Sequence, residues 1–279
     1  MTQLSSTTKP EFLWRSASLT DKGNVRQYNE DSFIARDDAS LWAVADGMGG
    51  HEAGDVASQL IVELLSKINP HTNLSTYVDI VDDTLIEANN QLRTLSREKY
   101  NNHTIGSTVV CMIASDRHIA YLWAGDSRIY RIRNRQIKQL TRDHSEVQNM
   151  VDQGLLLAEE AEAHPAANVI TRAMGAADAL YLSVGIEETL DKDIYILCSD
   201  GLYRDITERE LLKMALQPDI NNICSDMMQL ALSREAKDNI TTIILQSTIN
   251  GEANNDVNSK VNSSTNNANN TSNSIINSD

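Results

Sequence analysis

The chain has 279 residues, 41% of them hydrophobic, and a formal net charge of −15 with a pI near 4.8. This length is enough for one large domain or two small ones. Such an acidic chain lacks the basic surface that a phosphate backbone requires, which excludes nucleic acid as a partner. The three cysteines are widely spaced and form no CxxC pair. Neither a zinc site nor a disulfide framework is therefore indicated, and a reducing compartment is expected.

Membrane insertion and secretion are not indicated either. No apolar run approaches the ~18 residues that a membrane helix needs. The first nine residues are polar and lack the basic stretch followed by an apolar one that marks a signal peptide. We therefore expect a cytoplasmic protein. Because nothing in the pattern resembles a coiled coil, we also expect a monomer.

The order of apolar runs predicts a flexible leader over 1–10 and one domain over 11–248. Short β-branched or aromatic runs bounded by polar residues or glycine predict strands. In chain order these are 12–18, 32–36, 41–45, 106–114, 118–124, 128–133, 136–140, 193–198 and 240–247. Apolar residues at helical spacing predict helices at 54–68, 76–99, 144–153, 208–216 and 219–235.

The arrangement of these elements predicts an α+β fold. Local hairpins with an inserted pair of helices favour two packed, mainly antiparallel sheets with helices outside over alternating βαβ units. Residues 154–190 are less regular, and we expect them to form a flap. Residues 249–279 are rich in Asn and Ser. A segment of this composition cannot bury enough apolar surface to offset its ordering entropy, so a disordered tail is predicted.

Four Asp residues stand at the ends of apolar runs. Asp46, Asp126 and Asp200 each follow a predicted strand, and Asp238 precedes one. Carboxylates at the ends of core strands are driven together, and burying anions without partners is costly. A hard cation with oxygen ligands, such as Mg²⁺ or Mn²⁺, would offset this cost. The pattern therefore indicates a metal centre and phosphate chemistry.

A glycine-rich turn follows the first of these strands, with the sequence DGMGGHEAGD over 46–55. Glycine allows the backbone to approach closely, so the Asp46 side chain and an adjacent carbonyl can both face a cation. The alternative is a plain turn before a helix. A second Asp-Gly pair, at Asp200 and Gly201, again follows a buried strand and weakens that alternative.

The segment RQYNED over 26–31 adds a second group of charges. Glu30 and Asp31 point to opposite faces of an extended segment, so only one of them is expected to touch a metal directly. The planar guanidinium of Arg26 could grip a phosphate bidentately beside that metal. A solvated charge cluster is an equal alternative for this segment taken alone.

Several motifs together resemble one family. In order they are VRQYNED (25–31), DGMGGHEAG (46–54), GST (106–108), AGDSRIYR (124–131), LTRDHS (140–145), SDG (199–201) and KDNIT (237–241). The chain is similar to the metal-dependent protein phosphatase (PPM, type 2C) family of Ser/Thr phosphatases over 25–241. The resemblance implies a four-layer αββα sandwich, with 11–248 as the catalytic domain.

The resemblance also implies a centre of two Mn²⁺ or Mg²⁺ ions. Asp46 would bridge both ions, and Asp200 and Asp238 would complete the protein ligands of one ion. The Gly47 carbonyl, with Glu30 or its waters, would serve the other. By resemblance to bacterial members, Asp126 would hold a third ion together with Asp200. A hydroxide bridging the two ions would attack the phosphorus of phosphoserine or phosphothreonine directly.

Other positions carry roles by the same resemblance. Arg26 matches the phosphate-binding Arg, and Asn239 and Asp31 would support the ligands from outside. Eukaryotic members have a His directly after the Asp-Gly pair, where this chain has Met48. His51 is typical of bacterial members and is a candidate for protonating the leaving group. Support of the helix start is an equal alternative for His51, and a metal-bound water could be the acid instead.

The resemblance implies phosphoprotein substrates and a cognate bacterial Ser/Thr kinase whose action this chain reverses. Residues 14–31 and 41–65 resemble phosphatases that oppose a kinase and an FHA-domain protein in type VI secretion. Two other classes stay open. One is a catalytically inert pseudophosphatase that binds phosphoproteins, and the other is an acidic cation-binding structural protein. A third alternative keeps the enzyme but gives it small phosphoesters as substrates.

Overall fold

A computed structural model describes residues 12–49, 53–101 and 103–249. The predicted leader over 1–10 and the predicted tail beyond Ile249 lie outside the described residues. Ile249 itself is the last residue of a strand and lies opposite Phe12. The paired part of the chain therefore continues one residue past the predicted boundary at 248.

Two sheets form the centre of the molecule, and all their strand pairs are antiparallel. The first has the order β1 (Phe12–Asp21), β11 (Ile240–Ile249), β10 (Ile194–Cys198), β7 (Arg128–Arg133) and β8 (Gln136–Gln139). The second has the order β2 (Asp31–Arg36), β3 (Leu41–Met48), β5 (Val109–Ser115), β6 (His118–Ala124) and β9 (Ser183–Glu188), and β4 (Gly106–Ser107) pairs with β3.

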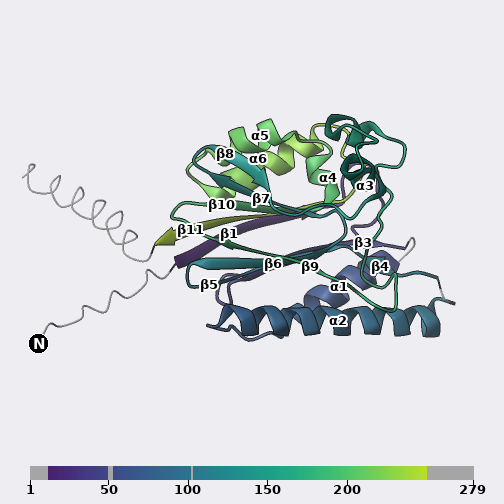
Figure 1. The fold of residues 1–279 in the computed structure, drawn as a ribbon. Helices are drawn as coiled ribbons and strands as arrows, with labels where there is room; N and C mark the ends of the chain where they lie inside the picture. The colour runs from purple at the N-terminus through teal and green to yellow at the C-terminus, as the bar shows by residue number, and fades with distance from the viewer. Residues whose placement is uncertain (1–11, 50–52, 102, 250–279) are drawn as a thin grey trace, which may run out of the picture.

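Helices cover the outer face of each sheet, which confirms the predicted αββα layers (Figure 1). The second sheet is covered by α1 (Ala53–Ser66) and α2 (Leu74–Lys99). The first is covered by α4 (Asp200–Tyr203), α5 (Glu208–Ala215) and α6 (Ile220–Leu232). The remaining helices are α3 (Glu146–Asp152) and η1 (Ala158–Ala163). Within the described ranges, no helix has the length and apolarity needed to cross a bilayer.

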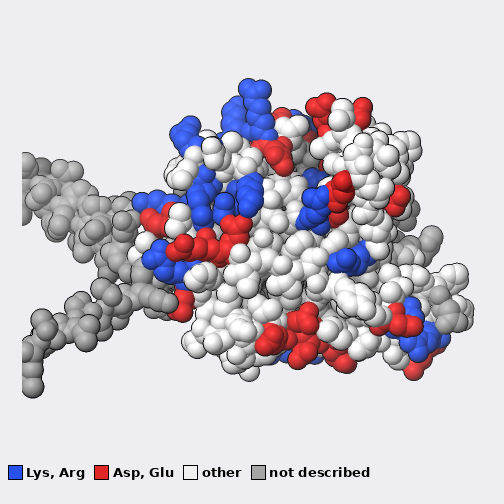
Figure 2. Space-filling model, viewed as in Figure 1, with Lys and Arg blue, Asp and Glu red and all other residues white. Residues whose placement is uncertain are grey.

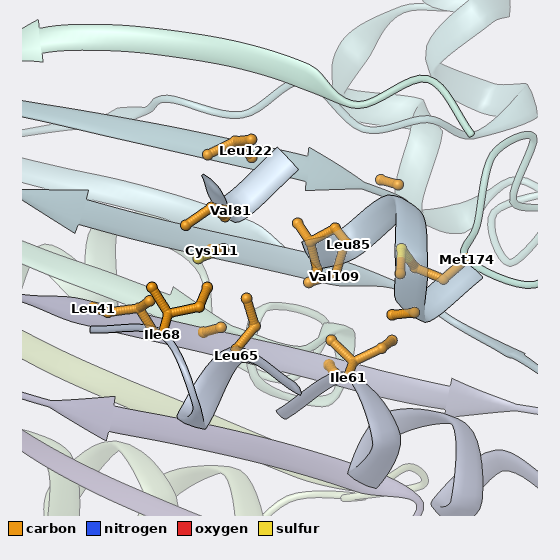
Figure 3. Packing of buried hydrophobic residues seen from close by; sticks show 14 of the residues in the cluster. Leu41, Ile61, Leu65, Ile68, Val81, Leu85, Val109, Cys111, Leu122 and Met174 are labelled. Carbon is orange, nitrogen blue, oxygen red and sulfur yellow. The ribbon is translucent and has the colours of Figure 1, made fainter. Parts of the chain in front are cut away.

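The apolar runs are continuous because the central strands are buried on both faces. In β3, Leu41 and Ala43 face α1 and α2, whereas Trp42 and Val44 face the other sheet. Figure 3 shows the helix side of this packing, where Leu41 lies in one cluster with Ile61, Leu65, Val81 and Leu85. Burial on both sides fixes the register of each strand, since a slip by one residue would exchange the two faces.

The edges of the two sheets are joined by ion pairs. Glu187 on β9 accepts from Lys138 on β8 at 2.9 Å and also pairs with Arg131 on β7. Figure 2 shows basic and acidic side chains lying side by side on this face of the molecule. Edge strands with charged side chains are protected against pairing with another chain.

Two predictions about the elements are corrected. The predicted strand 106–114 is divided at Thr108, whose N–H donates to the Asp46 carbonyl at 2.8 Å. The predicted flap over 154–190 is shorter than expected, because 183–188 form β9 and pair with β6. As an edge strand, β9 needs less burial, and Val184 and Ile186 are 47% and 60% exposed. The short α4 and η1 were not predicted either.

Antiparallel pairing decides where the charged residues lie. The end of each strand stands beside the start of its neighbour. In this way Asp31, at the start of β2, is the direct cross-strand neighbour of Asp46 near the end of β3. The end of β10 at Cys198 lies opposite Thr242 near the start of β11. One end of the sandwich therefore collects the loops that carry the acidic residues.

Candidate metal centre

A pocket of about 250 Å³ opens at this end of the sandwich. All predicted metal ligands and Arg26 line it, and they come from both sheets. The second sheet contributes residues before β2, in β3 and after β6, and the first sheet contributes residues after β10 and before β11. The lining residues are Arg26, Glu30, Asp46, Gly47, Met48, Gly49, Asp126, Asn168, Ile170, Asp200, Arg204 and Asp238.

The backbone of Asp46 is held by the strand after α2. The Asp46 carbonyl accepts from Ser107 Oγ at 2.9 Å and from the Thr108 N–H at 2.8 Å. The Asp46 N–H in turn donates to Thr108 Oγ1 at 3.2 Å. These bonds fix the peptide groups on both sides of the Asp46 side chain, so its carboxylate projects from a rigid position.

Glycine is required where the end of β3 and the start of α1 meet Glu30. A Cβ on Gly54 would lie 2.8 Å from Glu30 Cδ, and a Cβ on Gly47 would lie 2.1 Å from the Gly54 carbonyl oxygen. The Glu30 carbonyl also accepts from the Gly47 N–H at 3.1 Å and from Ser58 Oγ at 2.6 Å. The two glycines therefore let the end of β3 and the start of α1 pack against Glu30.

Asp31 lies beside the pocket without lining it. It is 7% exposed, and Ser199 Oγ donates to its Oδ2 atom at 2.8 Å. Its Oδ1 atom is buried and has no hydrogen-bond partner. Burial raises the pKa of Asp31 to about 7, and the nearby Asp200 and Asp238 add to the shift. The hydrogen bond from Ser199 opposes it.

The carboxylates in the pocket raise one another's pKa. Burial raises the pKa of Asp46 well above its usual value, with Asp31 and Asp200 adding to the effect. Burial, with a smaller contribution from the charge of Asp200, raises the pKa of Asp126 to about 7. The pKa of Asp200 is raised by burial as well, against the opposing charge of Arg204. The site thus concentrates more negative charge than nearby cations offset.

Two arginines supply positive charge in the pocket. Arg26 Nη2 lies 2.7 Å from Asp238 Oδ2, and Arg204 Nη2 lies 3.0 Å from Asp200 Oδ2 and 3.7 Å from Asp126 Oδ2. In this arrangement, no three Asp, Glu, His or Cys side chains of the described residues converge closely enough to hold one ion. Three of the pocket's carboxylates thus pair with an arginine.

The donor set nevertheless fits a hard divalent cation. It consists of carboxylate and carbonyl oxygens, which Mg²⁺ and Mn²⁺ prefer. The Asp200 Oδ1 atom is buried without a hydrogen-bond partner. Such an oxygen can accept a bond from a cation without losing a hydrogen bond. The raised pKa values have the same origin, since anions gathered in a partly buried site stay charged only with added positive charge.

Some pocket residues were not predicted from the sequence. Arg204, Asn168 and Ile170 line the pocket, the last two from the predicted flap. The signal for Arg204 was its position four residues after Asp200, which places both on one side of a helical turn. His51, the candidate acid, lies outside the described residues. Met48, which stands where eukaryotic members have His, lines the pocket.

A second layer of charges supports the pocket from behind. Arg128 binds Asp143 through two nitrogens, with Nη2 to Oδ2 at 2.7 Å, and its guanidinium lies 3.6 Å from the centre of the Tyr203 ring. The Tyr203 hydroxyl lies 3.5 Å from Asp126 Oδ2. Through the stacked Arg128 guanidinium, this ion pair anchors Tyr203, the residue before Arg204.

Comparison with known proteins agrees with this geometry. Residues 14–149 match the family model described as "Protein phosphatase 2C". The "Serine/threonine phosphatase stp" of Listeria monocytogenes serotype 4b (strain F2365) is 33% identical over 235 residues, which cover 81% of this chain and 93% of that protein. This chain belongs to the protein phosphatase 2C family. Members of this family are metal-dependent Ser/Thr protein phosphatases.

Other family members resemble the chain to differing extents. The "Serine/threonine protein phosphatase PstP" of Mycobacterium tuberculosis (strain H37Rv) is 31% identical over 230 residues, and the match spans 82% of this chain but only 44% of PstP. A PstP catalytic domain "in complex with 2 Manganese ions" superposes with a TM-score of 0.78 at 30% identity, over 85% of this chain and 99% of that one.

One solved structure is also similar over its whole length. It is the structure of "PppA, a key regulatory component of T6SS in Pseudomonas aeruginosa", and it superposes with a TM-score of 0.79 at 37% identity. The match covers 85% of this chain and 100% of PppA. The matched part of this chain therefore spans the whole of that solved chain.

Proposed function

We propose that this chain hydrolyses phosphoserine and phosphothreonine in proteins, with two Mn²⁺ or Mg²⁺ ions as cofactors. One observation carries the proposal: five carboxylates and Arg26, predicted from separate motifs, line a single pocket. In the proposed assignment Asp46, Asp200 and Asp238 would hold one ion, and Asp46, Glu30 and the Gly47 carbonyl would hold the other. Asp126 and Asp200 would hold a third ion.

The bound ions would acidify a water that attacks phosphorus and would neutralise charge on the phosphoryl oxygens. The chain's own residues position the reactants. Arg26 is exposed at the pocket and pairs with Asp238 through Nη2 alone. Its remaining guanidinium N–H groups are therefore available to grip phosphate oxygens. His51 is the proposed proton donor to the departing Ser or Thr oxygen, with a metal-bound water as the alternative.

The remaining assignments follow from the same proposal. Residues 11–248 would be the catalytic domain, with a leader before it and an Asn-rich tail after it, in a monomeric cytoplasmic protein. PppA is described as a regulatory component of T6SS. By analogy, we propose that this chain reverses a bacterial Ser/Thr kinase in type VI secretion, where an FHA-domain protein would be a partner.

Phosphate release from a phosphothreonine peptide tests the proposed activity. The reaction is run with Mn²⁺ and with EDTA, and Asp200→Asn serves as the control because it removes a ligand while preserving side-chain size. We expect release that requires Mn²⁺ and disappears in the variant. Peptide binding without release, from a folded protein, would favour the pseudophosphatase. Turnover of p-nitrophenyl phosphate that phosphopeptide does not inhibit would favour small phosphoesters.

A further inference from the structure

The guanidinium of Arg204 lies between two carboxylates that come from different sheets. Its Nη2 atom is 3.0 Å from Asp200 Oδ2, after β10, and 3.7 Å from Asp126 Oδ2, after β6. Among the described residues, Arg204 is the only Lys or Arg with an ion pair to either carboxylate. Its side chain is 25% exposed, so solvent screens this charge only in part.

Arg204 also contacts the segment that follows η1. Its Nη1 atom donates a hydrogen bond to Asn168 Oδ1. The backbone next to Asn168 is held separately, because the Val169 carbonyl accepts from the Glu146 N–H at 2.9 Å and the Thr171 N–H donates to the His144 carbonyl at 2.8 Å. Through Arg204, the Asn168 side chain thus links this segment to Asp126 and Asp200.

A divalent ion and the Arg204 guanidinium would compete for these two carboxylates, because binding of either cation weakens binding of the other. Both are positive, and an ion bound to Asp126 and Asp200 would stand within a few ångströms of Arg204 Nη2. Repulsion between like charges at such distances is strong in a partly buried site. Because Arg204 holds Asn168 with its other nitrogen, displacement of the guanidinium would also break the contact with Asn168.

We propose that Arg204 is a built-in counter-cation that competes with a divalent ion for Asp126 and Asp200, and that ion binding there releases Asn168. Arg204 is in this sense a positioning residue, since it acts on proposed ligands and not on reacting atoms. The inference rests on the proposed function, because it takes Asp126 and Asp200 as the site of the third ion. By linkage, whatever strengthens the contact between Arg204 and Asn168 weakens ion binding.

Mn²⁺ binding to the full-length, metal-free protein tests the competition without reference to activity. Isothermal titration calorimetry measures the number of ions bound and the Kd of the weakest one. In Arg204→Met, which keeps an unbranched apolar stem and removes the charge, we expect the weakest Kd to fall at least about tenfold. Arg209→Met, at an exposed position in α5, removes the same charge and should leave all Kd values unchanged.

A second variant tests the link to Asn168 and avoids any folding problem from unpaired carboxylates. Asn168 is exposed, and Asn168→Ala leaves Arg204 and both carboxylates in place. Losing one hydrogen bond that holds the guanidinium should lower the Kd of the weakest Mn²⁺ ion about fivefold. Hydrogen exchange should also show faster exchange at 166–171 in wild type at the Mn²⁺ concentrations that fill this site, and no further change in Asn168→Ala.

The outcomes separate this inference from the proposed function. If wild type binds Mn²⁺ and both Arg204→Met and Asn168→Ala give the wild-type isotherm, Arg204 does not compete and the inference is wrong. If neither wild type nor Arg204→Met binds Mn²⁺, the metal-dependent function fails, and the inference fails with it. If Arg209→Met lowers the Kd of the weakest Mn²⁺ ion as much as Arg204→Met does, the inference is also wrong. The effect would then depend on net charge and not on the position of Arg204.

Discussion

The side-chain oxygen of Asn239 accepts a hydrogen bond from the backbone N–H of Glu30 at 2.8 Å. Its amide nitrogen donates to the carbonyls of Lys22 and Tyr28 at 3.0 and 2.9 Å, and the Asn239 N–H donates to Asp238 Oδ1 at 2.9 Å. A single residue therefore sets the positions of two proposed ligands that belong to different sheets.

Replacing Asn239 by Ala should weaken metal binding without removing a ligand. The Glu30 N–H and two carbonyls would lose their partner in a site where Asn239 is only 5% exposed. Loss of such outer hydrogen bonds typically weakens metal affinity by about 10- to 100-fold. Calorimetric titration with Mn²⁺ measures the change. Asn221→Ala, at an exposed position in α6, is the control, and equal affinities in both variants would contradict the role of Asn239.

Asp46→Ala should nearly abolish phosphate release while the protein stays folded. Removing one of several carboxylates that repel one another costs the metal-free protein little, and the raised pKa of Asp46 reflects that repulsion together with burial. We expect the melting temperature in EDTA to equal or exceed that of wild type. Mn²⁺ should raise the melting temperature of wild type but not of the variant. Wild-type activity in folded Asp46→Ala would remove Asp46 from the centre.

Arg26→Ala should chiefly raise KM for the phosphopeptide, by about tenfold or more, because hydrogen bonds to a charged phosphate would be lost. Arg26→Lys should also raise KM, since a single ammonium cannot grip phosphate bidentately. Initial rates over a range of peptide concentrations measure the effect. Arg209→Ala is the matched control, and an unchanged KM in both Arg26 variants would exclude the clamp.

Arg128→Met should destabilise the protein strongly, because Asp143 would be left charged, buried and unpaired. The Arg128 and Asp143 side chains are 15% and 7% exposed. Breaking such a pair costs about 3–5 kcal/mol of unfolding free energy, whereas replacing both partners by apolar residues restores most of it. Urea denaturation of Arg128→Met and of Arg128→Met with Asp143→Leu tests this. Lys67→Met, in an exposed pair with Glu63, should have little effect.

His144 should make the protein less stable in mild acid. Burial lowers the pKa of His144 to about 4, and the charge of Arg172 adds to the shift. The unfolded chain binds this proton near pH 6.5, so the contribution of neutral His144 is complete above that pH and is lost as the pH falls toward 4. Urea denaturation at pH 7 and pH 5 should show a smaller loss in His144→Gln than in wild type. His118→Gln, at an exposed position, should behave as wild type.

The proposed ligands could be predicted from the sequence because they lie beside apolar runs or glycine-rich turns that are recognisable locally. Asp46, Asp126 and Asp200 follow runs that are buried on both faces, and such runs predict strands whatever they pair with. The glycines beside Asp46 were also visible, and the structure gives their reason in the close approach of Gly47 and Gly54 to Glu30. Periodicity and turn residues act over a few positions, so these features could be predicted without the fold.

Contacts between sheets were decided by the tertiary structure alone. Nothing in the local pattern places Asp126, two residues after β6, beside Arg204, which follows β10 by a few residues. The same holds for Asn239 and Glu30, which are 209 positions apart. Likewise β9 is a strand because β6 offers it a partner, although its outward side chains are exposed. Such contacts depend on how the two sheets pack, and packing is set by the whole chain at once.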